Sequence, residues 1–179
     1  MADQEHLTKI FNKMGYSDFR WVEPKEIVVA QWVRMKCMFG CDSYGKNASC
    51  PPNVPSIPDC RAFFDTYKIG AMLHFSALLP NHDDIQEWAK EINKGLVGLE
   101  REVFVAGHHK AFVLFVERCR FCRDCTNTRG ACKNKKLARP SIEAMGVDVF
   151  ATVAKYGFPI KVLPSNKHEI DKYALLLIE

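Results

Sequence analysis

The clearest pattern in the chain is helical. Between residues 5 and 14 the apolar side chains recur at three- and four-residue spacing and so share one face. Three further helices are predicted, at residues 58–67, 83–106 and 141–155. Ser56 and Ser141 stand where a helix N-cap would be expected. In the longest helix, charged residues such as Glu100 and Arg101 are expected to line a solvated face.

Runs of β-branched and other apolar residues between the helices predict strands. The predicted strands are residues 27–33, 69–79, 110–116, 159–163 and 173–178. Because strands and helices alternate, the expected fold class is α/β or α+β, with a sheet of about five strands covered by helices. The chain shows no internal repeat and no Gly/Ser linker, so residues 1–179 are expected to form a single domain.

Eight cysteines stand out from a composition that is otherwise ordinary for a globular protein. The first residues lack the apolar core of a signal peptide, and no stretch reaches the ~20 apolar residues that span a bilayer. We therefore expect a cytoplasmic protein without a membrane partner, whose thiols stay reduced. In that compartment, clustered thiols are typical of metal binding or redox chemistry.

The second half of the chain holds a cysteine group with the spacing C-x2-C-x2-C-x6-C. Its members are Cys119, Cys122, Cys125 and Cys132. Three cysteines separated by two residues each are typical of loops that hold a [4Fe-4S] cluster in bacterial ferredoxins. Zinc sites more often pair two C-x2-C units far apart in sequence, and zinc stays the alternative metal. The spacing thus indicates a metal site, with an iron–sulfur cluster as the leading interpretation.

The first half holds a looser group with the spacing C-x3-C-x8-C. Its members are Cys37, Cys41 and Cys50. Cys60 is a possible fourth ligand, although it lies in a predicted helix, where a cysteine can equally be a small core residue. With three thiolates only, one iron of a cluster would be open to a substrate, water or another side chain. Both loops, at about 37–60 and 119–132, are expected to leave strand ends.

The division of the cysteines into two sets stays open at this point, because ferredoxin loops can lend their last cysteine to the other cluster.

Basic residues surround the second group. They are Arg118, Arg120, Arg123, Arg129, Lys133, Lys135, Lys136 and Arg139. Such charges can offset metal-bound thiolates, dock an acidic redox partner protein, or merely keep the loop solvated. A nucleic-acid partner is disfavoured, because the formal net charge is only +4 and no RNA-stacking motif is present.

The histidines carry a weaker signal than the cysteines. Adjacent histidines on a strand point to opposite faces and do not easily ligate one metal. Turn or surface roles are therefore predicted for His74, His82, His108 and His109. The chain also lacks a phosphate-binding glycine loop and a nucleophile elbow, and nothing in it indicates a substrate pocket.

Two motifs in the chain resemble a known family. The first motif runs from Cys37 and Cys41 through Tyr44-Gly45-Lys46-Asn47 to Ser49-Cys50-Pro51-Pro52. The second motif begins with Leu99-Glu100-Arg101-Glu102 and contains Cys119, Cys122, Cys125 and Cys132. It ends with Ala138-Arg139-Pro140-Ser141-Ile142-Glu143-Ala144. Over residues 20–179 the chain is similar to the predicted metal-binding proteins grouped as domain of unknown function 2284.

The resemblance implies a set of seven cysteine ligands and leaves Cys60 out of it. It also implies an anaerobic prokaryotic source, which suits oxygen-sensitive clusters, and no assigned reaction. Arg139, Ser141 and Glu143 match the family motif and are expected to brace the second loop or to tune the metal.

Three functions follow as hypotheses. The first is an iron–sulfur protein, with two [4Fe-4S] clusters, that transfers electrons or presents a cluster to a partner. The second is a zinc-stabilised binding module without a redox role. The third is an enzyme that uses the open iron of a three-cysteine cluster. Simple dithiol–disulfide exchange needs fewer thiols than this chain has. The reaction, substrate and oligomeric state have no signature in the sequence.

Overall fold

The computed structural model describes residues 2–162 and 169–179. In chain order its elements are α1 (Ala2–Lys13), β1 (Phe19–Val22), the 3-10 helix η1 (Pro24–Glu26), α2 (Gln31–Gly40), α3 (Ile57–Asp65), β2 (Gly70–Ala77), α4 (His82–Val105), β3 (Phe112–Leu114), α5 (Val149–Lys155) and β4 (Ile170–Leu177). The described residues thus form a mixed α and β fold, as the sequence predicts.

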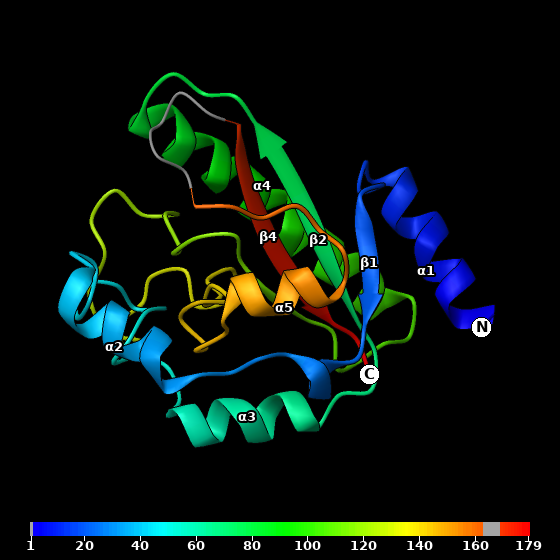
Figure 1. The fold of residues 1–179 in the computed structure, drawn as a ribbon, viewed down its shortest axis with the longest axis horizontal. Coiled ribbons are helices and arrows are strands. Elements are labelled where there is room, and N and C mark those ends of the chain that lie inside the picture. The colour runs from blue at the N-terminus through cyan, green and yellow to red at the C-terminus, as the bar shows by residue number, and fades with distance from the viewer. Residues whose placement is uncertain (1, 163–168) are drawn as a thin grey trace.

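The four strands form one antiparallel sheet in the order β1-β2-β4-β3. The C-terminal strand β4 is central: Gly70 of β2 pairs with Leu177 on one side, and Phe112 of β3 pairs with the same residue on the other. Figure 1 shows β4 and β2 crossing the middle of the molecule, with α5 in front of the sheet and α4 behind it.

The sheet is buried on both faces, because successive residues of β4 point into two different cores. Tyr173, Leu175 and Leu177 belong to a core closed by α3 and α5, whereas Ala174, Leu176 and Ile178 belong to a core closed by α1 and α4. We call these the α3/α5 core and the α1/α4 core. The near-continuous apolar run of β4 is what a strand covered on both faces requires.

Helix starts follow from capping side chains. Ser56 Oγ accepts a hydrogen bond from Asp59 N, Asn81 Oδ1 from Asp84 N, and Asp148 Oδ1 from Ala151 N. The predicted helices at 5–14, 58–67 and 83–106 are confirmed within a few residues.

The predicted helix from Ser141 is wrong in its first half. Ser141 Oγ accepts from Ala144 N, but the turn ends at Gly146, whose φ of +78° no helix interior adopts. The helix starts anew at Val149, and Asp148 is its N-cap.

Two of the five predicted strands are also wrong. In the segment 27–33 only Val29 makes a bridge, to Val147, and α2 begins at Gln31. Residues 159–162 form no strand, and residue 163 lies outside the described part of the chain. The sheet instead gains β1, a short strand with a mixed polar pattern that the hydrophobic runs do not single out. The observed sheet therefore has four strands among the described residues, not five.

Glu100 corrects the expectation of a uniformly solvated face on α4. Its side chain is buried, and its Oε2 accepts hydrogen bonds from Val113 N (2.7 Å) and Arg139 Nε (3.0 Å), while Oε1 accepts from Arg139 Nη2. The exposed face is formed by residues nearer the start of α4, where Lys90 pairs with Glu87 and Lys94 with Glu91.

Both cysteine-rich segments lie on the side of the molecule opposite α1 and the N-terminus (Figure 1). The second segment follows β3, as expected for a loop at a strand end. The first does not: Cys37 lies in α2 and Cys41 directly after it, so this group leaves a helix end. Within 2–162 and 169–179, no helix combines the length and apolar character needed to cross a membrane.

Truncation of Leu176 tests the two-sided burial of β4. Leu176 is fully buried in the α1/α4 core, so Leu176→Ala should lower the free energy of unfolding by about 2–5 kcal/mol. The matched control Leu78→Ala removes the same atoms from an exposed side chain just beyond β2. It should change the free energy of unfolding by less than about 0.5 kcal/mol. Denaturant unfolding measures both, and equal effects would contradict the packing described here.

Candidate metal centre

The first cysteine group comprises Cys37 near the end of α2, Cys41 just after it, and Cys50 in the following loop. Cys41 is exposed, Cys37 is partly buried, and Cys50 is 8% exposed. Burial, together with the negative charges of Cys41, Cys37 and Cys119, raises the pKa of the Cys50 thiol to about 12, an effect that the Arg118 guanidinium opposes. The first group therefore combines one buried, one partly buried and one exposed thiol.

Arg34 fixes the helix that presents Cys37. From α2 its guanidinium Nη2 donates to the carbonyl oxygens of Pro55 (3.1 Å) and Ala144 (3.0 Å). These contacts join α2 to the end of the first cysteine loop and to the turn that precedes α5. Arg34 thus helps to fix the position of Cys37 through contacts with the scaffold.

The second group follows β3 in a loop without regular structure. Cys119, Cys122, Cys125 and Cys132 are all partly buried, and burial raises the pKa of the Cys119 thiol, with the charges of the other three adding to the shift. Two sulfurs already accept hydrogen bonds: Cys122 Sγ from Asn134 Nδ2 (3.0 Å) and Cys125 Sγ from Ala48 N (3.3 Å). Hydrogen bonds of this kind are also made to the sulfur ligands of metal centres.

The two groups are in contact with each other. Asn47 Nδ2 donates to the carbonyl of Cys119 (2.8 Å), while Asn47 Oδ1 accepts from Ser49 N (2.9 Å). Asn53 Nδ2 donates to the carbonyls of Asn47 (3.1 Å) and Asn127 (2.7 Å). The first loop thus lies directly against the second. The sequence spacing contains no signal for this contact.

Cys60 lies apart from both groups. It is fully buried in the α3/α5 core, where its Sγ lies 3.5 Å from the Pro55 carbonyl oxygen and 4.0 Å from Met145 Sδ. Burial raises the pKa of the Cys60 thiol, and the charges that act on it are those of Arg34 and Asp59 rather than those of other cysteines. Its surroundings are those of a small core residue.

The ion pair between Glu100 and Arg139 closes the second loop. Arg139 follows the loop, stacks on Phe112 with its guanidinium carbon 5.4 Å from the ring centre, and donates to the carbonyls of Lys136 (3.1 Å) and Ala138 (3.2 Å). Two residues further on, Ser141 pairs with Phe115 in a parallel bridge. Arg139 therefore joins α4, β3 and the loop end, which agrees with a bracing role.

Not all of the basic residues near this loop are available to a partner. Arg139 is held by Glu100, and Arg120 donates to Gln86 Oε1 (2.6 Å) and lies 3.7 Å from Glu117. Arg123, Arg129, Lys133, Lys135 and Lys136 are exposed and Arg118 is partly exposed. These six form a basic rim around the second group.

Two histidines are withdrawn from the surface, contrary to the expected surface roles: His108 is buried and His74 is partly buried. The His74 ring lies between two carboxylates, with Nδ1 2.7 Å from Asp18 and Nε2 2.8 Å from Asp171, and it stacks on Tyr173. His108 lies between Asp3 (3.3 Å) and Glu179 (3.8 Å). A single-sequence pattern cannot reveal either set of histidine–carboxylate contacts, since the partners come from distant elements.

A pocket lies beside the first cysteine group and corrects the expectation that the chain has none. Its cavity has a volume of about 410 Å³, and its walls include Trp32, Cys37, Cys41, Glu143, Phe150 and Tyr173. We call it the α2/α5 pocket. Burial raises the pKa of the Glu143 carboxyl, an effect that the Lys172 ammonium opposes.

A second cavity, of about 550 Å³, lies against the second group. Cys119, Cys122 and Cys125 line it together with Arg118 and Arg123 of the basic rim. Three of the four cysteines of the second group thus border one cavity.

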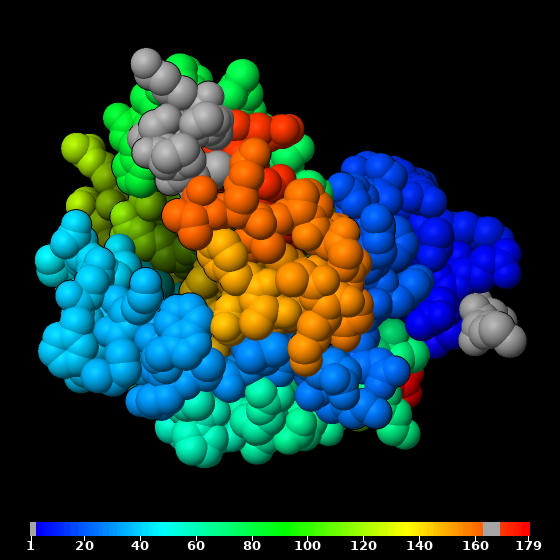
Figure 2. Space-filling model, in the orientation of Figure 1, coloured from blue at the N-terminus to red at the C-terminus, as the bar shows by residue number. Residues whose placement is uncertain are grey.

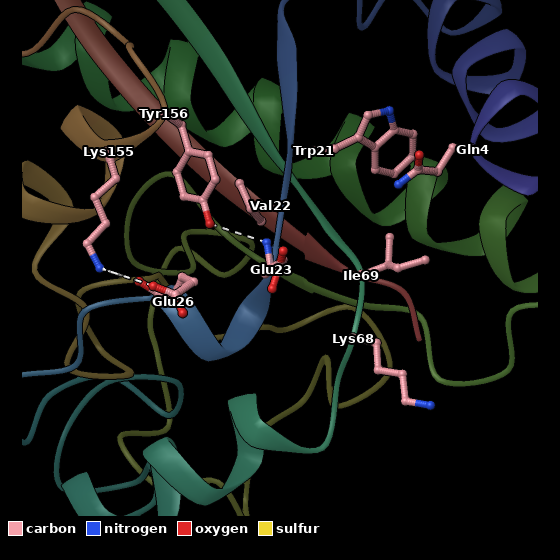
Figure 3. Close-up of a pocket in the computed structure, with 9 residues that line it drawn as sticks. All are labelled: Gln4, Trp21, Val22, Glu23, Glu26, Lys68, Ile69, Lys155 and Tyr156. Carbon is pink, nitrogen blue, oxygen red and sulfur yellow. Dashed lines mark hydrogen bonds and ion pairs between the residues drawn. The ribbon is translucent and has the colours of Figure 1, made fainter. Parts of the chain in front are cut away.

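A third hollow, of about 460 Å³, lies away from the cysteines, between α1, β1 and α5 (Figure 3). Its polar groups are largely paired with one another: Lys155 Nζ donates to the Glu26 carbonyl oxygen (3.0 Å), and Glu23 N donates to Tyr156 Oη (3.2 Å). Figure 3 shows Lys68 pointing away from the other side chains. No cysteine or histidine lines this hollow in the described residues, so we assign it no chemistry.

Comparison with known proteins supports the metal-centre interpretation. Residues 20–178 match the family described as "Predicted metal-binding protein (DUF2284)". The chain belongs to this family. The DUF2284 match begins at β1 and contains all eight cysteines, the basic rim and the α2/α5 pocket. Searches of curated proteins and of solved structures returned no match.

Substitution of Asn47 tests the contact between the two groups. Asn47→Ala leaves the Cys119 carbonyl and the Ser49 amide without their partner, which should cost about 1–3 kcal/mol of unfolding free energy. The variant should also retain less metal than the wild type during dialysis against a chelator. Asn12→Ala, on the exposed face of α1, is the control and should leave both quantities unchanged. Full retention of metal in Asn47→Ala would rule the bridge out as a support of the centre.

Replacement of Cys60 separates core cysteines from metal ligands. Cys60→Ala should keep the full metal content, because its sulfur faces Met145 and not the other thiols, and it should cost about 1 kcal/mol of stability through a small cavity. Cys122→Ser should lose metal, since serine is a poor replacement for a soft thiolate. Elemental analysis of both variants decides the point: equal metal loss would make Cys60 a ligand.

Proposed function

We propose that this protein binds two iron–sulfur clusters, one at each cysteine group, and that it transfers electrons. Membership of a family described as predicted metal-binding proteins supports the binding of metal, and the proposal of electron transfer rests on the contact between the two groups. Asn47 Nδ2 donates to the Cys119 carbonyl oxygen, and Ala48 N donates to Cys125 Sγ, so the loop that carries Cys50 lies against the second group. Metal centres held by two loops in direct contact would suit electron transfer between them.

The residues present fit such clusters. Cys37, Cys41 and Cys50 would hold the first, and Cys119, Cys122, Cys125 and Cys132 the second, with sulfur ligands of the kind that iron–sulfur clusters use. Ala48 N and Asn134 Nδ2 donate to the second set, and hydrogen bonds to ligand sulfurs are a principal means by which a protein tunes a cluster. When bound, the clusters supply one-electron redox chemistry; the protein supplies the ligands, hydrogen bonds and burial.

Zinc is the second candidate, because four cysteine thiolates also form tetrahedral structural zinc sites. The sequence spacing of the second group favours the cluster, since three cysteines separated by two residues each are typical of [4Fe-4S] loops. Zinc sites more often pair two C-x2-C units that lie far apart in sequence.

The basic rim supports an acidic redox partner. Arg123, Arg129, Lys133, Lys135 and Lys136 are exposed around the second group, where a partner would approach the metal centre. Opposite charge on the partner would steer the encounter and raise the association rate, an effect that salt screens. The second group would then be the point of electron exchange, and the first group would lie further along the path.

Metal and sulfide analysis tests the proposal. Protein purified without oxygen should be brown and contain about eight iron atoms, with as many acid-labile sulfides, per chain. Zinc in place of iron, with no sulfide, would refute the proposal in favour of the zinc module.

Spectroscopy of the reduced protein then tests whether the clusters are adjacent. Two paramagnetic centres that are close together broaden or split each other's resonances. Cys122→Ser should remove the second cluster and leave the first with a simple, uncoupled spectrum. A wild-type spectrum that is the plain sum of two independent centres would contradict the proposed path.

A further inference from the structure

The α2/α5 pocket has two exposed aromatic side chains in its walls. Trp32 is 49% exposed and Phe150 is 45% exposed, and both line the pocket from different elements, α2 and α5. Val116, Val147 and Val149 add apolar surface to it. Figure 2 shows α2 and the residues after α5 on one face of the molecule, with a hollow between them. The volume of about 410 Å³ is typical of small-molecule sites.

The charged side chains that line the pocket are only partly paired with one another, and positive charge is left over. Lys172 is paired with Glu117 (2.7 Å), and the carboxylate of Asp171 contacts His74 (2.8 Å). Lys36 and Lys161 also line the pocket, and among the described residues no ion pair is found for either. Lys36 lies over the Trp32 ring, 5.9 Å from its centre. Against these two lysines stands Glu143, whose burial disfavours its charged form.

We propose that the α2/α5 pocket binds a small organic carboxylate with an apolar, preferably aromatic, body. The aromatic side chains of Trp32 and Phe150 hold the body of the ligand, and Lys36 and Lys161 bind its carboxylate. The ligand lies beside Cys37 and Cys41, two members of the first cysteine group. The meaning of this position for redox chemistry rests on the proposed function, but the binding site itself does not.

The position of the pocket gives the first group a different role from the second. A group with three cysteines leaves room for a further ligand at its metal, and oxygen donors bind iron readily. A carboxylate in this pocket is held next to two of the three thiols, whereas the second group has four thiols and a polar cavity. The inference therefore assigns ligand binding to the first group and electron exchange to the second.

Benzoate is the probe that tests the proposal, with benzamide as its neutral counterpart. Binding is measured by saturation-transfer NMR and calorimetry on anaerobically purified protein. Wild type should bind benzoate at least about tenfold more tightly than benzamide, because only benzoate pairs with the lysines.

Two variants with matched controls locate the bound benzoate. Phe150→Ala and Lys36→Met should each weaken benzoate binding about tenfold. Phe104→Ala, which truncates an equally exposed aromatic residue on α4, and Lys133→Met, in the basic rim, should leave it unchanged. Absence of saturable binding, equal binding of benzamide, or insensitivity to Phe150→Ala would overturn the proposal.

The position beside the first group has a separate readout. Paramagnetic iron there should broaden the ring-proton resonances of bound benzoate in the metal-loaded protein, and this broadening should persist in Cys122→Ser, which lacks the second cluster. Iron and sulfide content is measured on the same samples. If the protein binds benzoate but contains no iron, the pocket proposal is supported and the cluster proposal is refuted. If the clusters are loaded but benzoate does not bind, the cluster proposal stands and the pocket proposal is refuted.

Discussion

One buried ion pair, between Glu100 and Arg139, holds the scaffold and the cysteine-rich region together. Glu100 projects from α4 and accepts from Val113 of β3, while Arg139 stands at the end of the second loop. Loss of Arg139 would leave the buried Glu100 carboxylate without its charged partner, a change that typically costs about 3–5 kcal/mol. The loop before Arg139 has no helix or strand of its own among the described residues, so its ends must be set from outside. The ion pair and the bridge from Phe115 to Ser141 fix the C-terminal end of the second cysteine loop.

The first cysteine group depends on contacts of a different kind. Its helix is tied down by Arg34, and its loop is tied to the second loop through Asn47 and Asn53. All of these are side chains that donate to backbone carbonyls. They satisfy peptide groups that irregular segments would otherwise leave unpaired, and they fix positions without occupying the cavities that the thiols face. Polar bracing thus leaves the sulfurs accessible to metal.

The sequence predicts those parts of the molecule in which local pattern decides the structure. Three helices, the strands around β2, β3 and β4, and the two cysteine groups are all visible in spacing and periodicity. The errors occur where distant contacts decide. In residues 31–33, the aromatic Trp32 and the β-branched Val33 favour a strand. Contacts of Arg34 with the turn before Gly146 instead accompany a helix there. Glu100 has the sequence of a surface residue, and only its distant partner Arg139 explains its burial. The α2/α5 pocket is formed by segments more than a hundred residues apart, for which one sequence holds no signal.

The hydrogen bond from Ala48 N to Cys125 Sγ joins the backbone of the first cysteine loop to a sulfur of the second group. Ala48 lies two residues before Cys50, so the first loop presents its amide to a thiol that the second group would use as a ligand. If both groups hold metal as proposed, filling one would change the affinity of the other by the same factor in either order, because linkage is reciprocal. Loading would then be cooperative, with singly filled protein less populated than independent sites would give.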